Sequence, residues 1–240
     1  METVEYDGLK ILSGINTHPG SGNVFQHEHE IRLFKSIIED VDPNNPVMIE
    51  IGSFWGLWSL LFRKKFENGK NILIELGKRQ LYVGLRNFYN NRFDCAFYHG
   101  GFNVEDSQTF ENRKFDIEYD TYADADVNID NLISSDEELR GYFECMEMTG
   151  KNLEFEKIIT ENKIDEISLL HMDIQGSELN LIRDIRSYLK SKKIINLVVA
   201  THSSQIHEEI INILKSYEYK ILIESEYGSI GGDGYIYAKI

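Results

Sequence analysis

Apolar runs alternate with amphipathic segments along most of the chain. Apolar stretches that end at turn residues predict strands, which lie at 47–52, 71–76, 94–99, 167–173, 194–200, 219–225 and 234–240. Helical spacing of apolar residues predicts helices near 26–40, 56–66, 78–90, 151–163, 177–190 and 204–217. This alternation, with short connections, predicts a Rossmann-like α/β fold whose seven-stranded, mostly parallel sheet has helices on both faces.

Three regions depart from this alternation. The last two strands follow each other without a helix across a glycine-rich loop, which predicts an antiparallel hairpin at one edge of the sheet. Residues 1–24 are rich in turn residues, so we expect residues 1–45 to form a loosely ordered arm and a helix on the substrate side of a domain at 46–240. Acidic residues crowd 103–140, which is interpreted either as a solvated flap or as a lid over the substrate.

The most informative pattern is an apolar run that ends on Glu50 and leads at once into a glycine turn at Gly52. A second apolar run ends on Glu75, whose carboxylate is placed to accept hydrogen bonds from two ribose hydroxyls. A dinucleotide would need glycines two and five positions after Gly52, but Phe54 and Leu57 stand there. The spacing therefore favours a ligand with a ribose and no pyrophosphate, of which S-adenosylmethionine is the common example. A glycine turn that binds no ligand is the alternative.

Composition narrows the class of protein. The chain has 240 residues and a formal net charge of −15 at pH 7, which suits one domain and disfavours nucleic acids and anionic membranes as partners. The two cysteines, Cys95 and Cys145, lie in no Cys-x-x-Cys or Cys/His pattern and predict neither a disulfide framework nor a zinc site. Without a signal-peptide pattern or a membrane-spanning apolar run, we expect a cytoplasmic protein. Whether it forms a homo-oligomer stays open.

A second strand-like run also leads into an acid, a turn and a helix, through the residues Met172-Asp173-Ile174-Gln175-Gly176-Ser177-Glu178. In an open α/β sheet the carboxyl ends of the strands form the ligand-binding edge. Gly52, Glu75, Asp173 and His202 all fall at such ends, so we expect them to lie close together. This convergence is the main physical argument for a site.

These residues carry a resemblance to a known family. Ile49-Glu50-Ile51-Gly52, Glu75 and the segment 172–178 resemble the FkbM family of class I S-adenosylmethionine-dependent methyltransferases, over roughly residues 45–240. The family commonly has a lysine where His171 stands, and Gly-Ala-Asn-x-Gly where this chain has residues 52–56. The resemblance implies the class I methyltransferase fold, with its C-terminal antiparallel hairpin, and S-adenosyl-L-methionine as the cofactor.

The resemblance and the strand-end positions assign a role to each candidate residue. The residues expected at the methionine end of the cofactor are Glu50, Gly52, Ser53, Trp55 and Gly56. The residues expected on the ribose and adenine are Glu75, Leu76 and Phe102. Asp173 and Gln175 are expected where cofactor and acceptor meet, and the acceptor itself is expected to contact His27, Gln175 and Gly232.

Transfer of a methyl group to a hydroxyl calls for a base, because a hydroxyl is a poor nucleophile at neutral pH. His202 is the first candidate for this catalytic base, with Asp173 beside it. A divalent metal ion held by Asp173 and His202 is an alternative, although two ligands are too few to define a site. Helix capping is the structural alternative, since Thr201 and Ser203 flank His202. His207 is expected to face solvent.

The resemblance points to O-methylation of a sugar hydroxyl, on a cell-surface polysaccharide precursor or a nucleotide-activated sugar, in a bacterium. O- or N-methylation of a natural product is the alternative acceptor chemistry. A non-catalytic cofactor-binding module is an alternative of another class, and the bulky Trp55 in the glycine turn keeps it open. The missing second glycine and the terminal hairpin weigh against a nucleotide-dependent oxidoreductase.

Overall fold

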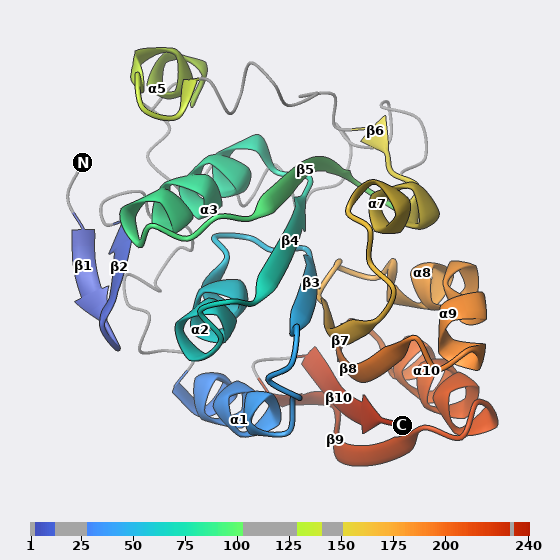
Figure 1. The fold of residues 1–240 in the computed structure, drawn as a ribbon. Helices are drawn as coiled ribbons and strands as arrows, with labels where there is room; N and C mark the ends of the chain where they lie inside the picture. The colour runs from blue at the N-terminus through green and yellow to red at the C-terminus, as the bar shows by residue number, and fades with distance from the viewer. Residues whose placement is uncertain (1–2, 13–27, 103–128, 141–150, 231–232) are drawn as a thin grey trace.

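The computed structural model describes residues 3–12, 28–102, 129–140, 151–230 and 233–240 (Figure 1). The strands in this part of the chain are β1 Thr3–Tyr6, β2 Leu9–Leu12, β3 Val47–Ile51, β4 Lys70–Glu75, β5 Ala96–Gly101, β6 Lys151–Asn152, β7 Ile167–Met172, β8 Ile194–Thr201, β9 Lys220–Ile230 and β10 Asp233–Lys239. The helices are α1 Glu28–Glu39, α2 Leu57–Lys65, α3 Lys78–Asn90, α5 Ile129–Ser135, α7 Phe155–Glu161, α8 Glu178–Asp184, α9 Arg186–Lys190 and α10 Ser204–Ser216.

The larger of the two described sheets has eight strands in the order β6-β5-β4-β3-β7-β8-β10-β9. The strands from β6 to β8 in this order run parallel, and β10 lies antiparallel to both β8 and β9. Each strand predicted from the sequence is present, and the hairpin at the C-terminal edge is confirmed. The additional strand, β6, has two residues and pairs with the end of β5 at the other edge.

Helices cover both faces of this sheet, as the sequence predicts. Successive strand residues point to opposite faces, so each central strand contributes to two cores. Ile49 of β3 lies in one core with Leu181 of α8 and Ile210 of α10. Met48, the preceding residue, lies in the other core with Phe34 of α1. Figure 1 shows α1, α2 and α3 on one side of the sheet and α7 to α10 on the other.

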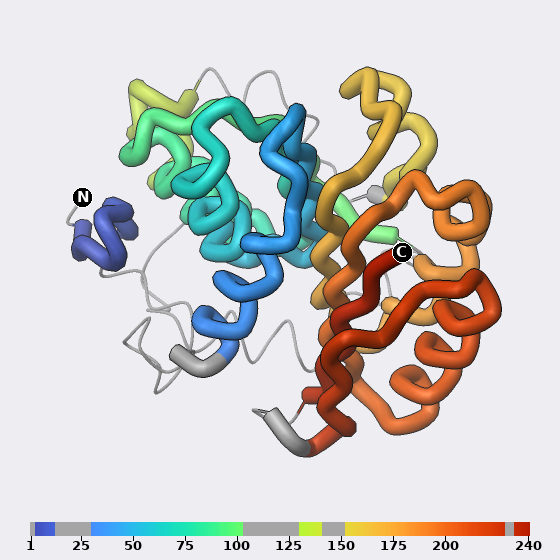
Figure 2. The backbone as a smooth tube through the Cα atoms, turned by 60° about the horizontal axis from the view of Figure 1, so that its bottom comes forward, coloured from blue at the N-terminus to red at the C-terminus, as the bar shows by residue number. Residues whose placement is uncertain are grey.

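Residues 3–12 form a β-hairpin, β1 and β2, where a loosely ordered arm was expected. Residues 13–24, which belong to the same expectation, lie outside the described residues. Asp7 and Gly8 have φ angles of 51° and 72°, which a tight two-residue hairpin turn requires. Asn87 of α3 accepts a hydrogen bond from the N–H of Leu12 at 2.7 Å, which docks the hairpin on α3. In Figure 2 the hairpin lies far from the C-terminal strands.

One other expectation differs from the structure, and the interpretation of 103–140 as a flap or a lid stays untested, because residues 103–128 lie outside the described residues. The helix expected at 177–190 is divided into α8 and α9, which meet at the buried residue Ile185. Within the acidic segment 103–140, residues 129–140 include α5 and are tied to α3. There the hydroxyl of Tyr82 donates to Asp136 at 2.9 Å. No helix in the described ranges is long and apolar enough to cross a membrane.

Candidate active site

The ends of four neighbouring parallel strands bring the predicted residues to one edge of the sheet. Gly52 follows β3, Glu75 ends β4, Asp173 follows β7 and His202 follows β8. In the sheet these strands are adjacent, in the order β4-β3-β7-β8. The expected convergence of strand ends is therefore present in the structure.

Gly52 lets the turn after β3 approach the turn after β7. Its φ is 73°, and a β-carbon placed on it would lie 1.7 Å from the carbonyl oxygen of Asp173. The N–H of Asp173 donates to the carbonyl of Ile51 at 2.9 Å, so the strands stay paired up to this point. Gly56, which precedes α2, also has a positive φ of 76°. Glycine at position 52 is thus required by the packing of two strand ends, independently of any ligand.

Glu75 ties the glycine turn to the end of β4. One carboxylate oxygen accepts a hydrogen bond from the N–H of Phe54 at 2.6 Å. The other accepts from the N–H groups of Leu76 and Gly77 at 2.8 and 2.7 Å. Burial raises the pKa of Glu75 to about 7, although these amide bonds oppose the shift. Three of roughly four acceptor positions of the carboxylate are thus occupied, which leaves room for a ribose hydroxyl.

Two buried oxygen atoms close to the glycine turn have no hydrogen-bond partner in the described part of the chain, Oε1 of Glu50 and Oγ of Ser53. The other carboxylate oxygen of Glu50 accepts from the N–H of Ser59 at 3.0 Å. Burial raises the pKa of Glu50 to about 8. Buried polar atoms without partners are costly. An ammonium group, which has three donors, fits such atoms, so the residues present suit the methionine part of S-adenosylmethionine.

The remaining residues predicted to bind the cofactor lie along the same edge. Trp55 is half-buried, and its carbonyl accepts from the side-chain amide of Asn87 at 3.0 Å. The carbonyl of Leu76 lies 3.0 Å from Nε2 of His99. The side chain of Phe102 is buried in the core. Only the backbone of this residue is therefore placed to contact adenine. Contact of these residues with adenine or methionine stays a prediction.

A buried carboxylate holds His202. Nδ1 of His202 lies 2.8 Å from Oε1 of Glu178, whose side chain is fully buried. The carboxylate of Glu178 also accepts from the N–H groups of Ile174 and Gly176 at 3.1 and 3.0 Å. These bonds fix the turn between β7 and α8 and the orientation of the imidazole together.

The other ring nitrogen of His202, Nε2, lies 3.4 Å from Oδ1 of Asp173 and 3.7 Å from Oδ1 of Asp233. It is buried and has no hydrogen-bond partner among the described residues. Burial lowers the pKa of His202, but the bond to Glu178 and the charges of Asp173, Glu178 and Asp233 raise it above its usual value. Burial raises the pKa of Asp173 to about 6. The side-chain amide of Gln175 donates to Asp173 at 3.2 Å.

The structure does not place every predicted residue. His27 and Gly232, expected to contact the acceptor, lie outside the described residues. Within the described ranges, no group of three His, Cys, Asp or Glu side chains is arranged to hold a metal ion. Among the described residues, Asp173 and His202 therefore have no third side chain that could complete a metal site with them. The prediction that His207 faces solvent is wrong, because α10 packs on the sheet and buries its side chain.

The sequence predicted no function for three acidic residues at this edge, which are Glu178, Asp233 and Glu30. Glu178 belongs to the segment that carries the family resemblance, and its place at the start of α8 is the signal that could have found it. Asp233 begins β10, which the antiparallel pairing brings beside the end of β8. Glu30 on α1 contributes to the raised pKa of Asp233, although burial is the larger cause.

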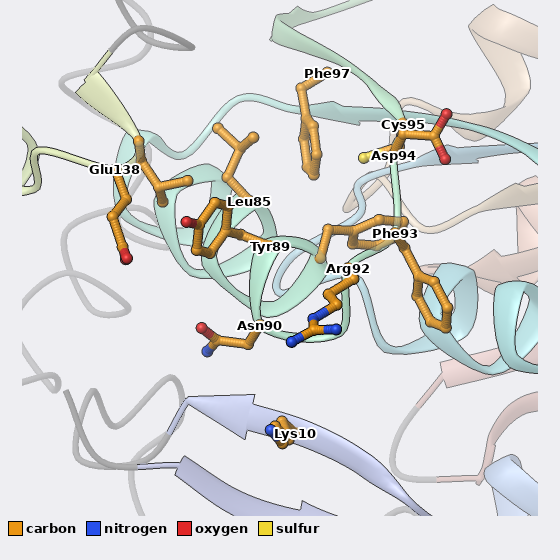
Figure 3. A pocket seen from close by; sticks show the side chains of 12 residues that line it. Lys10, Leu85, Tyr89, Asn90, Arg92, Phe93, Asp94, Cys95, Phe97 and Glu138 are labelled. Atoms are coloured by element: carbon orange, nitrogen blue, oxygen red, sulfur yellow. The ribbon is translucent and has the colours of Figure 1, made fainter.

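A cavity of about 640 Å³ lies elsewhere, near the amino-terminal end of β5. Phe88 and Tyr89 of α3, Cys95 before β5 and Lys10 of β2 are among the residues that line it (Figure 3). The predicted site residues lie at the carboxyl ends of the strands. This cavity contains none of them and is not the candidate active site.

Solved methyltransferases share this fold at low sequence identity. Precorrin-6y C5,15-methyltransferase from Geobacter metallireducens GS-15 has a TM-score of 0.51 at 10% identity, over 98% of this chain and 94% of that one. The tRNA (uracil-54, C5)-methyltransferase of Pyrococcus abyssi, in complex with S-adenosyl-L-homocysteine, has a TM-score of 0.53 at 11% identity, over 99% of this chain and 43% of that one. The N-terminal domain of human METTL16, also in complex with S-adenosyl-L-homocysteine, has a TM-score of 0.51 at 12% identity, over 97% and 75%.

The fold is thus that of the class I S-adenosylmethionine-dependent methyltransferases, and the residues at the carboxyl edge suit that cofactor. The sequence matches the family model described as methyltransferase FkbM domain over residues 40–221, which is more than half of the chain. The chain belongs to the FkbM methyltransferase family. Comparison with curated protein sequences gave no match.

Proposed function

We propose that this protein transfers a methyl group from S-adenosylmethionine to a hydroxyl of a small acceptor that carries no phosphate, such as a sugar. One observation carries the proposal. At the edge where the family binds its cofactor, His202 is fixed through Nδ1 while its Nε2 atom has no hydrogen-bond partner in the described chain. An oriented imidazole with one free nitrogen is the arrangement that a catalytic base requires.

The residues that would hold the cofactor surround the glycine turn. Glu50 and Ser53 offer buried acceptor atoms to the methionine end, and Glu75 offers its carboxylate to the ribose. When bound, S-adenosylmethionine supplies an electrophilic methyl group on a sulfonium. The protein then has to align the acceptor oxygen with that methyl group and exclude water.

His202 removes the proton from the acceptor. Nε2 of His202 would accept the proton of the acceptor hydroxyl as its oxygen takes the methyl group, and the sulfur of the cofactor would keep the electron pair of the broken sulfur–carbon bond. The carboxylates of Asp173 and Asp233, at 3.4 and 3.7 Å from Nε2, stabilise the positive charge that the imidazole gains. Because the pKa of His202 is raised by these charges and by Glu178, turnover should increase as pH rises above the ordinary histidine range.

The charge around His202 favours an acceptor without phosphate. Asp173 and Asp233 face Nε2, and Glu30 adds negative charge near Asp233. A phosphate group would be repelled by these acids. Arg183, a basic residue of α8, is already paired with Glu209 at 2.5 Å. A neutral sugar therefore suits the site better than a nucleotide-activated sugar. The same acids would attract an amino group, which makes N-methylation the second candidate.

The biological setting extends this proposal. A cell-surface polysaccharide precursor, modified in the cytoplasm, is the acceptor class that we favour. Two of the similar structures are named as tRNA or METTL16 methyltransferases, but nucleic acids are poor acceptor candidates for a chain with a net charge of −15.

Transfer of radiolabelled methyl groups from S-adenosylmethionine tests the proposal. The acceptors are neutral sugars, amino sugars and nucleotide-activated sugars, each assayed with EDTA and with added Mg²⁺. We expect label in a neutral or amino sugar and little in a nucleotide sugar. Preferential labelling of a nucleotide sugar would overturn the charge argument. A requirement for Mg²⁺ would replace the histidine base with metal activation of the acceptor.

A further inference from the structure

We propose that Glu178 is a positioning residue that holds neutral His202 in the tautomer with the proton on Nδ1, and so leaves Nε2 as the basic nitrogen. The catalytic consequence rests on the proposed function, in which His202 is the base. The tautomer itself is a property of the protein without any acceptor.

The hydrogen-bond pattern around Glu178 leads to this tautomer. The Glu178 carboxylate is fully buried and meets three groups, Nδ1 of His202 and the N–H groups of Ile174 and Gly176. Both backbone groups donate. Oε1, the atom that contacts His202, already accepts from both of these N–H groups and therefore acts as an acceptor, so the short contact of 2.8 Å to His202 requires a hydrogen on Nδ1. Neutral imidazole has one hydrogen for its two ring nitrogens, and Nε2 is then the unprotonated atom.

Among the described residues, Nε2 of His202 makes no hydrogen bond to a competing acceptor. Nε2 lies 3.4 Å from Asp173 and 3.7 Å from Asp233, both longer than the bond to Glu178. The charged groups that act on the ring are Glu178 on α8, Asp173 after β7 and Asp233 on β10. Glu30 on α1 acts in turn on Asp233, and Tyr235 on β10 interacts with Asp173. Asp173 and Asp233 are placed to stabilise a proton that arrives on Nε2, whereas Glu178 alone fixes the hydrogen on Nδ1.

A purely structural role for Glu178 makes a different prediction. If Glu178 served only to shape the turn between β7 and α8, the tautomer of His202 would not depend on it. Glu178→Gln can keep an oxygen at the position that accepts from His202, so it preserves the tautomer while it removes a negative charge. The methionine in Glu178→Met has a similar length but no carboxylate to accept from Nδ1, so His202 is free to adopt either tautomer.

The first test is nitrogen NMR of wild-type protein labelled with ¹⁵N-histidine, in a pH titration, with His202→Gln used to assign the signal. Above the titration midpoint we expect an unprotonated Nε2 and a protonated Nδ1. A protonated Nε2, or an even mixture of both tautomers, would overturn the proposal. This measurement needs no variant of Glu178, so it decides the matter even if Glu178→Met does not fold.

The second test compares variants on the best acceptor of the labelling assay. We expect Glu178→Met to lower kcat by on the order of a hundredfold with the KM for the cofactor unchanged. Glu178→Gln should retain most of kcat, with the rising limb of its pH profile moved to lower pH. Glu208→Gln, at an exposed position of α10, is the control and should match wild type. Wild-type kcat in Glu178→Met would contradict the proposal.

The two proposals fail in different ways. If calorimetry shows no binding of S-adenosylhomocysteine, the proposed function fails and the tautomer result stands. If the cofactor product binds and Nε2 carries the proton, the role of Glu178 fails and the methyltransferase function stands.

Discussion

Replacement of Glu50 by glutamine should change how the stability of the protein depends on pH. Glu50 is fully buried, one of its oxygens has no partner in the described chain, and burial raises its pKa from 4.5 to about 8. Below pH 4.5 the folded and unfolded chains both hold this proton. Between pH 4.5 and about 8 only the folded chain holds it, so stability falls as pH rises through this range. Glutamine is neutral throughout and removes the effect.

The size of the effect follows from the two pKa values. A tenfold change in proton affinity corresponds to about 1.4 kcal/mol, so a rise from 4.5 to about 8 corresponds to about 5 kcal/mol once Glu50 is ionised in both states. Between pH 5 and pH 8.5 the change amounts to about 4 kcal/mol. Glu75 and Asp173 titrate in both proteins, and their charges add to the raised pKa of Glu50, so the difference between wild type and Glu50→Gln measures Glu50 together with its coupling to these two carboxylates.

Urea unfolding of both proteins from pH 5 to pH 8.5 measures this difference. We expect the free energy of unfolding of Glu50→Gln, relative to wild type, to increase steadily with pH. Glu67→Gln, at an exposed position, is the control and should differ from wild type by a constant amount. A constant difference for Glu50→Gln as well would refute the reasoning, because it would mean that Glu50 ionises equally easily in both states.

Three further variants test the strand-end residues. Gly52→Ala should lower the free energy of unfolding by at least about 2 kcal/mol, because alanine is strained at a φ of 73° and its β-carbon would lie 1.7 Å from the carbonyl oxygen of Asp173. Gly228→Ala is the control, because Gly228 also has a positive φ but has open space where a β-carbon would lie. If both variants lost the same free energy of unfolding in urea, the steric contact with Asp173 would be contradicted. Glu75→Ala should weaken binding of S-adenosylhomocysteine by about 1–3 kcal/mol in calorimetry, and unchanged affinity would remove its ribose role. His202→Ala should reduce turnover roughly a hundredfold or more in the labelling assay without loss of cofactor affinity, and near-normal turnover would exclude it as the base.

Much of the fold could be predicted because its signals are local. Each strand of the main sheet except β6 contains a short apolar stretch, and the direct succession of β9 and β10 indicated the hairpin. The N-terminal hairpin could not be predicted in this way. Its turn is marked only by Asp7-Gly8, and its anchor, Asn87, lies 75 residues from the backbone group that it binds.

The site was predictable in position more than in detail. Parallel strands bring their carboxyl ends together, so Gly52, Asp173 and His202 could be grouped from the sequence alone. The partner of His202 could not be predicted from the sequence. Glu178 lies 24 residues away along the chain, and its contact with His202 depends on a side-chain orientation that residue spacing does not determine. His207 was misplaced for a similar reason, since burial of one helix face depends on how α10 packs on the sheet.

Calorimetric titration of the purified protein with S-adenosylhomocysteine, with NADH in parallel, measures whether the glycine turn and Glu75 form a binding site for a methyltransferase cofactor. We expect micromolar binding of S-adenosylhomocysteine and no binding of NADH. Binding of NADH, or failure to bind S-adenosylhomocysteine, would contradict the assignment of the glycine turn and Glu75 to a methyltransferase cofactor.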